Sequence, residues 1–287
     1  MADDAFPASI KDNQSLSRRG FAALSVGAGL AVASQAFAAD VVETDVEVKT
    51  PDGTCDAALF HPPGEGHWPG AIIFTDILGL RPVFRDMGRR LAADGYTVLV
   101  PNPFYRTRKA PVIEGPFDFS KPEDRAKLGP LTAPLTREAV TRDCGAYIAW
   151  LGKQAAADRH RKLGVVGYCM GGPYTLIAAS LAQDRVGAGV SCHGGGLVTA
   201  APDSPHLLIP KIKATFYFGI AANDDARQPD AKTTLKAAFD AVPTPAMVEV
   251  YAGDSHGWCV KDNPTYDAAG AERAWANLTS LYGRVLV

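Results

Sequence analysis

The sequence has no excess of charge of either sign. Its 29 lysines and arginines nearly balance its 31 aspartates and glutamates, and the formal net charge is −2 at pH 7. Proteins that bind nucleic acids usually carry a positive net charge or a run of basic residues. This balance gives no argument for such binding, and we therefore predict no nucleic-acid partner.

Paired cysteines are also missing. The five cysteines contain no C-x-x-C motif and no spacing typical of zinc ligands, so the sequence predicts no metal site, and it calls for no organic cofactor. Four of them are expected to be small apolar residues of strands or helices. These four are Cys55, Cys144, Cys192 and Cys259. Cys169 is the exception, because it lies between glycines.

The N-terminal region lacks a hydrophobic run suited to crossing a bilayer. After Arg18-Arg19, the stretch AALSVGAGLAVASQ is short, rich in Gly and Ala, and followed by the small-x-small pattern Ala36-Phe37-Ala38. These features are similar to a twin-arginine export signal. We predict that residues 1–39 are such a signal, read by the twin-arginine export machinery. The mature chain would then be periplasmic or otherwise exported, with no membrane contact after cleavage. An uncleaved anchor or a disordered tail is the alternative.

The rest of the chain has the composition of a folded α/β domain. With 47% hydrophobic residues in 287, it can bury a sizeable core, and we predict a single domain over residues 40–287. The expected strands are 41–49, 55–60, 71–75, 97–101, 162–168, 187–192, 214–220 and 247–251. The expected helices are 83–94, 136–154, 171–182, 231–241 and 266–281. Two opening strands followed by strand-helix alternation predict a mostly parallel sheet with helices on both faces.

One segment departs from this alternation. Residues 101–135 are rich in proline and have no steady period. Such a long excursion is typical of a lid or a wall of a substrate pocket, although a surface loop with no role in the site is the other interpretation.

The stretch GVVGYCMGGPY, residues 164–174, resembles the cysteine form of a nucleophile elbow. In G-x-S-x-G and its cysteine variant, the nucleophile occupies a strained turn between a strand and a helix. Gly167 and Gly171 leave room where a Cβ would collide with the neighbouring backbone. The N-terminus of the following helix favours the thiolate of Cys169, which is the attacking species.

Partners for this nucleophile follow later in the chain. Asp224 and Asp225 come just after the expected strand 214–220, and His256 comes just after the strand 247–251. The order of nucleophile, acid and histidine, each at the carboxyl end of a strand, is that of the α/β-hydrolases. We therefore predict the α/β-hydrolase fold with a catalytic triad.

These motifs resemble the dienelactone hydrolase (carboxymethylenebutenolidase) family across essentially all of residues 41–287. The resemblance rests on GYCMGG, on His256-Gly257 followed by an aromatic residue, and on Asp76-Ile77-Leu78-Gly79. It implies hydrolysis of a small ester or lactone through a thioester, with a triad of Cys169, His256 and one aspartate. An Asn-Asp pair in the family favours Asp224, whereas the spacing to the following proline favours Asp225.

The resemblance also implies roles for residues around the triad. The backbone N–H groups of Ile77 and Met170 would form the oxyanion hole. Asp76 occupies the place of a glutamate that helps to activate the thiol in the family. Its side chain is one methylene shorter than glutamate. It would therefore either reach the sulfur of Cys169 or only order its own loop. Arg106 would bind a substrate carboxylate, but the second arginine of that clamp is replaced by Val260. A small ester or lactone is therefore a better prediction than dienelactone itself.

Two other features leave alternatives. His193-Gly194-Gly195-Gly196 resembles the oxyanion-hole motif of some lipases, but it lies downstream of the nucleophile. We interpret it as a close-packed turn lining the pocket, with His193 structural. Cys169 could also be oxidised in a thiol-redox or sensing protein, or the fold could serve as a binding module without catalysis.

Overall fold

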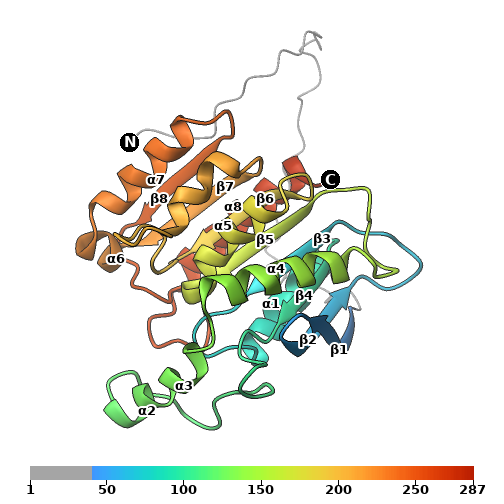
Figure 1. Ribbon diagram of the computed structural model, residues 1–287, viewed down its shortest axis with the longest axis horizontal. Coiled ribbons are helices and arrows are strands. Elements are labelled where there is room, and N and C mark those ends of the chain that lie inside the picture. The colour runs from blue at the N-terminus through green and yellow to red at the C-terminus, as the bar shows by residue number, and fades with distance from the viewer. Residues whose placement is uncertain (1–40) are drawn as a thin grey trace, which may run out of the picture. The chain divides into compact units, whose positions relative to one another are not determined.

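Eight strands form one sheet in the computed structural model, which describes residues 41–287 (Figure 1). The strands are β1 (Val42–Thr50), β2 (Gly53–His61), β3 (Gly70–Phe74), β4 (Thr97–Pro101), β5 (Leu163–Tyr168), β6 (Val186–Cys192), β7 (Thr215–Ala221) and β8 (Ala246–Tyr251). Their order across the sheet is β1-β2-β4-β3-β5-β6-β7-β8. β1 and β2 pair antiparallel, β2 pairs antiparallel with β4, and all the remaining pairs are parallel. The mostly parallel α/β-hydrolase sheet predicted from the sequence is therefore confirmed.

Helices cover both faces of this sheet. The longer ones are α1 (Pro82–Ala93), α4 (Arg137–Leu151), α5 (Gly172–Leu181), α7 (Asp230–Asp240) and α8 (Ala268–Val285). One buried cluster joins apolar residues of α1 and α8 to one face, and a second joins those of α4, α5 and α7 to the other. The central strand β5 is buried along its whole length, as expected for a strand covered on both faces.

The helix boundaries follow local sequence signals. Pro82 occupies the first turn of α1, where a missing N–H is harmless. The side chains of Thr136 and Asp267 cap the N-termini of α4 and α8 by accepting backbone N–H groups one turn ahead. These caps fix the starts of the two helices within two residues of the prediction.

The structure adds short elements that the sequence pattern does not show. The 101–135 segment contains two one-turn helices, α2 (Pro122–Ala126) and α3 (Leu128–Thr132), which project away from the sheet (Figure 1). A 3-10 helix, η2, spans Pro205–Lys211, and α6 (Ala222–Arg227) follows β7 directly. Helices this short have too few turns for a periodic apolar face, so their sequences carry no helical pattern.

The parallel strands all point their carboxyl ends to one edge of the sheet. Asp76, Cys169, His193, Asp224 and His256 follow β3, β5, β6, β7 and β8 respectively, and these five strands are neighbours. The topology thus gathers at one edge residues that are distant in the sequence.

No helix within residues 41–287 is long and apolar enough to cross a membrane. The predicted export signal, residues 1–39, lies outside the described residues, so twin-arginine export and the exported location stay predictions.

Candidate active site

Cys169 lies in a sharp turn between β5 and α5. Its φ is +52°, a left-handed conformation that side chains other than glycine seldom adopt and that costs about 1–2 kcal/mol. A short 3-10 turn, η1 (Cys169–Gly171), connects the strand to the helix. The side chain is half-buried, whereas the other four cysteines are buried and free. The local geometry is that of a nucleophile elbow.

Backbone segments pack closely around this turn. A Cβ at Gly171 would lie 2.7 Å from the carbonyl oxygen of Thr75, at the end of β3. A Cβ at Gly167 would lie 2.8 Å from the nitrogen of Gly172. The segments that carry Met170 and Ile77 therefore meet backbone to backbone, which only glycine permits.

We expect Gly171→Ala to destabilise the protein by about 3 kcal/mol or to prevent folding, because backbone atoms cannot move aside as flexible side chains do. Gly283→Ala is the matched control, since it lies in α8 with nothing within 4 Å of a new Cβ. It should stabilise the helix by about 0.5–1 kcal/mol. Urea unfolding of both variants measures the difference, and equal midpoints would show that the elbow tolerates a side chain.

His256 and Asp224 form a hydrogen-bonded pair. The Nδ1 atom of His256 lies 2.5 Å from Oδ2 of Asp224. The backbone of His256 is anchored on both sides, because its N–H donates to Oδ1 of Asn223 at 2.9 Å and its C=O accepts from the hydroxyl of Thr265 at 2.7 Å. Asp225 points elsewhere, and both its oxygens bind Lys232 at 2.7 and 2.8 Å. Of the two aspartates left open by the sequence, Asp224 is the one beside the histidine.

Charges around His256 favour its protonated form. Burial by itself lowers the pKa of this imidazole, but the hydrogen bonds with Asp224 and with Cys169 outweigh burial and raise the pKa to about 10. The imidazolium is bound by one carboxylate, and the sulfur of Cys169 also favours its charged form. This arrangement suits a thiolate at Cys169.

Asp76 is bound to an arginine. Its two oxygens accept from the guanidinium of Arg81 at 2.6 and 2.9 Å, and Oδ1 also accepts the N–H of Leu78 at 2.9 Å. Arg81 in turn binds Asp262 at 2.8 and 2.9 Å, in the loop that follows His256. Asp76 thus orders the loop containing Ile77 and ties it, through Arg81, to the loop of the histidine.

Arg106, which was expected to bind a substrate carboxylate, is paired with acidic side chains of the protein. Its guanidinium forms a two-pronged ion pair with Asp143, both contacts being 2.8 Å, and a second ion pair with Asp52 at 2.5 Å. Its side chain is 12% exposed. Arg142 shares Asp52 at 2.7 Å. The arginine expected to face a substrate carboxylate is therefore already neutralised by two carboxylates of the protein.

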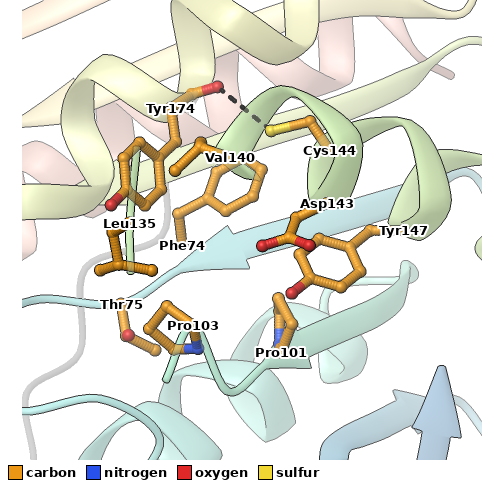
Figure 2. A pocket seen from close by; sticks show the side chains of 10 residues that line it. All are labelled: Phe74, Thr75, Pro101, Pro103, Leu135, Val140, Asp143, Cys144, Tyr147 and Tyr174. Atoms are coloured by element: carbon orange, nitrogen blue, oxygen red, sulfur yellow. Dashed lines mark hydrogen bonds between the residues drawn. The ribbon is translucent and has the colours of Figure 1, made fainter. Parts of the chain in front are cut away.

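A narrow, mostly apolar pocket lies between the end of β3, α4 and the first turn of α5, the helix that follows the elbow (Figure 2). Phe74 and Thr75 line it from the end of β3, Asp143 from α4, and Tyr174 from the first turn of α5. The remaining lining residues are Pro101, Pro103, Leu135, Val140, Cys144 and Tyr147. Burial raises the pKa of the Tyr174 hydroxyl, and the charges of Cys144 and Asp143 raise it further.

The 101–135 segment forms one wall of this region. Met170, the residue after the nucleophile, packs against a small apolar cluster of this segment. The cluster comprises Phe104, Val112 and Leu131, with Ile113 and Leu135 at its edge. Of the two interpretations of the excursion, the pocket wall therefore agrees with the structure.

Several site residues carry no local signal in the sequence. Arg81 and Asp262 are separated by 181 positions, and only the fold brings them together. Asn223 is the first member of the Asn-Asp pair noted in the sequence, but its hydrogen bond with the backbone N–H of His256 was not predicted. Within residues 41–287, no cluster of three or more His, Cys, Asp or Glu side chains is arranged to hold a metal ion.

The parallel sheet, the elbow and the aspartate-bound histidine at the strand ends define an α/β-hydrolase. The sequence pattern of the dienelactone hydrolase family matches residues 55–286, and the chain belongs to this family. It is accordingly an ester or lactone hydrolase.

Individual relatives cover most of the chain. A protein of Methylorubrum extorquens named "Putative carboxymethylenebutenolidase" is 28% identical over 290 residues, which cover 96% of each chain. The carboxymethylenebutenolidase of Pseudomonas sp. strain P51 is 25% identical over 225 residues, 78% of this chain and 87% of the relative. Among solved structures, a "Putative Dienelactone Hydrolase" from Klebsiella pneumoniae superimposes with a TM-score of 0.74 at 20% identity, covering 85% of this chain and 99% of the other.

Proposed function

We propose that this hydrolase cleaves a small ester or lactone by covalent catalysis, with Cys169 as nucleophile, His256 as general base and acid, and Asp224 as the orienting carboxylate. The observation that carries the proposal is the 2.5 Å hydrogen bond between Nδ1 of His256 and Oδ2 of Asp224, at the sheet edge that also carries Cys169. The influence of Cys169 on the pKa of His256 supports it. A catalytic triad requires that the carboxylate binds the histidine and that the histidine acts on the nucleophile.

The reaction would proceed in two halves. The proton of the Cys169 thiol already resides on His256 in the resting ion pair, and the thiolate attacks the carbonyl carbon, whose π electrons move to oxygen. The backbone N–H groups of Ile77 and Met170 hold this oxyanion, and each such donor is worth on the order of 3 kcal/mol. The C–O bond to the leaving group then breaks while His256 returns its proton to the leaving oxygen.

The second half releases the acid. The first half leaves a thioester between the acyl group and Sγ of Cys169. His256 removes a proton from water, the hydroxide attacks the thioester carbonyl, and the C–S bond breaks. Lactones with enol leaving groups suit this site best, because an enolate departs more easily than a simple alkoxide.

Rapid quenching of the reaction with p-nitrophenyl acetate tests this mechanism directly. We expect a burst of nitrophenolate, and peptide mass spectrometry should find one acetyl group on Cys169 that hydroxylamine removes. Acylation at another residue would overturn the nucleophile assignment. Steady turnover with no acyl-enzyme under any quench time would argue against the thioester, and oxidation of Cys169 to sulfenic acid without turnover would favour a redox role.

We also propose that the substrate is uncharged next to its reacting carbonyl. Arg106 is neutralised by Asp52 and Asp143, and Asp143 is buried against the pocket. Burial raises the pKa of Asp143, and its hydrogen bonds with Arg106 and Tyr105 oppose that rise. A substrate carboxylate in this pocket would lose its hydration and would find no unpaired cation to bind. Its transfer from water would therefore be unfavourable.

A matched pair of enol lactones, one with a free carboxylate and one with the same group as a methyl ester, measures this preference. We expect kcat/KM to be at least about tenfold higher for the methyl ester, a difference of about 1.4 kcal/mol. Asp143→Asn should reduce the difference in kcat/KM between the two lactones, because Arg106 then keeps only one carboxylate partner. A wild-type preference for the free carboxylate would contradict the proposal.

A further inference from the structure

Cys169 shares an unusual backbone conformation with one other residue, His193. Their φ angles are +52° and +41°, and among residues 41–287 they are the only residues other than glycine with positive φ. They directly follow β5 and β6, in which Tyr168 is paired with Cys192. The two left-handed residues therefore lie side by side at the end of adjacent strands.

Hydrogen bonds join the two residues. The backbone N–H of Cys169 donates to Nδ1 of His193 at 3.1 Å. The backbone C=O of Cys169 accepts the N–H of Gly195 at 3.1 Å. The N–H of His193 donates to the carbonyl of Gly219, on β7, at 2.8 Å. Both backbone polar groups of the nucleophile are thus held by the turn after β6, and that turn is fixed to the next strand.

The contact with Cys169 sets the tautomer of His193. Because Nδ1 accepts a hydrogen bond, the ring proton is on Nε2 and the imidazole is neutral. The residue is 1% exposed, and its ring packs against the rings of His256 and Trp258 at centroid distances of 5.0 and 5.1 Å. Burial lowers the pKa of His193 well below its usual value, and the charge of His256 lowers it further. The surroundings therefore keep Nδ1 free to accept.

We propose that His193 is a positioning residue for the nucleophile: its Nδ1 atom holds Cys169 in the left-handed conformation that presents Sγ to His256. Because the backbone N–H of Cys169 donates to His193, it is not available to an oxyanion. The backbone N–H of Met170 is therefore the donor that the elbow offers to the oxyanion. This inference rests on the proposed function. It gives His193 a role in the chemistry, in addition to the structural one expected from the sequence.

Two substitutions separate positioning from packing. His193→Asn keeps an acceptor at the place of Nδ1, and asparagine tolerates the left-handed region. His193→Gly permits the same backbone but has no acceptor. His206→Asn is the matched control, because this histidine of η2 hydrogen-bonds Ser204 at 2.7 Å instead.

We expect His193→Gly to lower kcat by about 100-fold with KM changed less than about threefold, because a displaced nucleophile mainly affects the chemical step. Alkylation of Cys169 by iodoacetamide at pH 7 should slow as well, since the thiol no longer faces His256. His193→Asn should recover most of both rates, and His206→Asn should behave as the wild type.

Two results would overturn the proposal. One is a glycine variant with wild-type kcat and alkylation rate. The other is an equal loss of kcat in the asparagine and glycine variants, together with an equal fall in their thermal unfolding temperatures. A purely structural residue would behave in this way. A wild-type enzyme that forms no acyl-Cys169 would instead refute the proposed function, and the alkylation rates would still report whether His193 positions the thiol.

Discussion

Cys169→Ala should lose hydrolysis of enol lactones and activated esters by about 10⁴-fold or more, since no other group can form the covalent intermediate. The assay uses residues 40–287, the predicted mature chain, with a panel of both substrate types. The residual rate is expected to come from the oxyanion donors and from binding alone.

Folding of the variant is the necessary control. Cys169 is half-buried, and alanine removes only the sulfur, so the unfolding midpoint should stay within about 1 kcal/mol of the wild type. Cys55→Ala provides a second control, because this buried cysteine belongs to β2 and is not among the residues that line the pocket. Wild-type rates in Cys169→Ala would exclude the nucleophile assignment.

Asp224→Asn is expected to lower kcat by about 10²–10⁴-fold, whereas Asp225→Asn should remain within a few-fold of the wild type. The physical reason is that Asp224 fixes the orientation of His256 and stabilises its positive charge. Asp225 binds Lys232 and has no hydrogen bond with the histidine. Both variants remove one charge from the same helix, α6, and an unfolding curve of each variant controls for effects on folding.

The titration of His256 gives an independent readout of the same pair. NMR should find its imidazole protonated up to a pH of about 10 in the wild type. Removing the charge of Asp224 takes away a cause of the raised pKa, so in Asp224→Asn the proton should leave at lower pH, and in Asp225→Asn the midpoint should stay near the wild-type value. Equal midpoints in all three proteins would mean that Asp224 does not act on His256.

Hydrophobic periodicity was enough to predict the strands and long helices of this fold. The expected strand 162–168 and the observed β5, Leu163–Tyr168, differ only at Lys162, because both end at Tyr168, directly before the turn that carries Cys169. The candidate nucleophile and histidine were also visible, since each follows such a strand. Position after a strand is a local property, and the sequence records it directly.

Side-chain directions and distant partners were not predictable in this way. Asp224 and Asp225 are neighbours in α6, and only the direction of each side chain decides which one meets His256. Arg106 pairs with Asp52, which lies 54 positions earlier, and no local sequence pattern predicts this pair. The same holds for the contact between Nδ1 of His193 and the backbone N–H of Cys169. Such contacts depend on how strands are ordered in the sheet.

The 101–135 segment, which forms part of the pocket wall, is separate in the sequence from the proposed catalytic residues, and this separation affects how the specificity of the enzyme can evolve. The proposed acid, base and nucleophile follow β7, β8 and β5. The 101–135 segment is inserted between β4 and α4, lines the pocket with Pro101, Pro103 and Leu135, and packs on Met170. Exchange of that one insertion alters which molecules enter while leaving the reacting groups in place. Chemistry and selectivity are thus encoded in different parts of the chain, and each can diverge without the other.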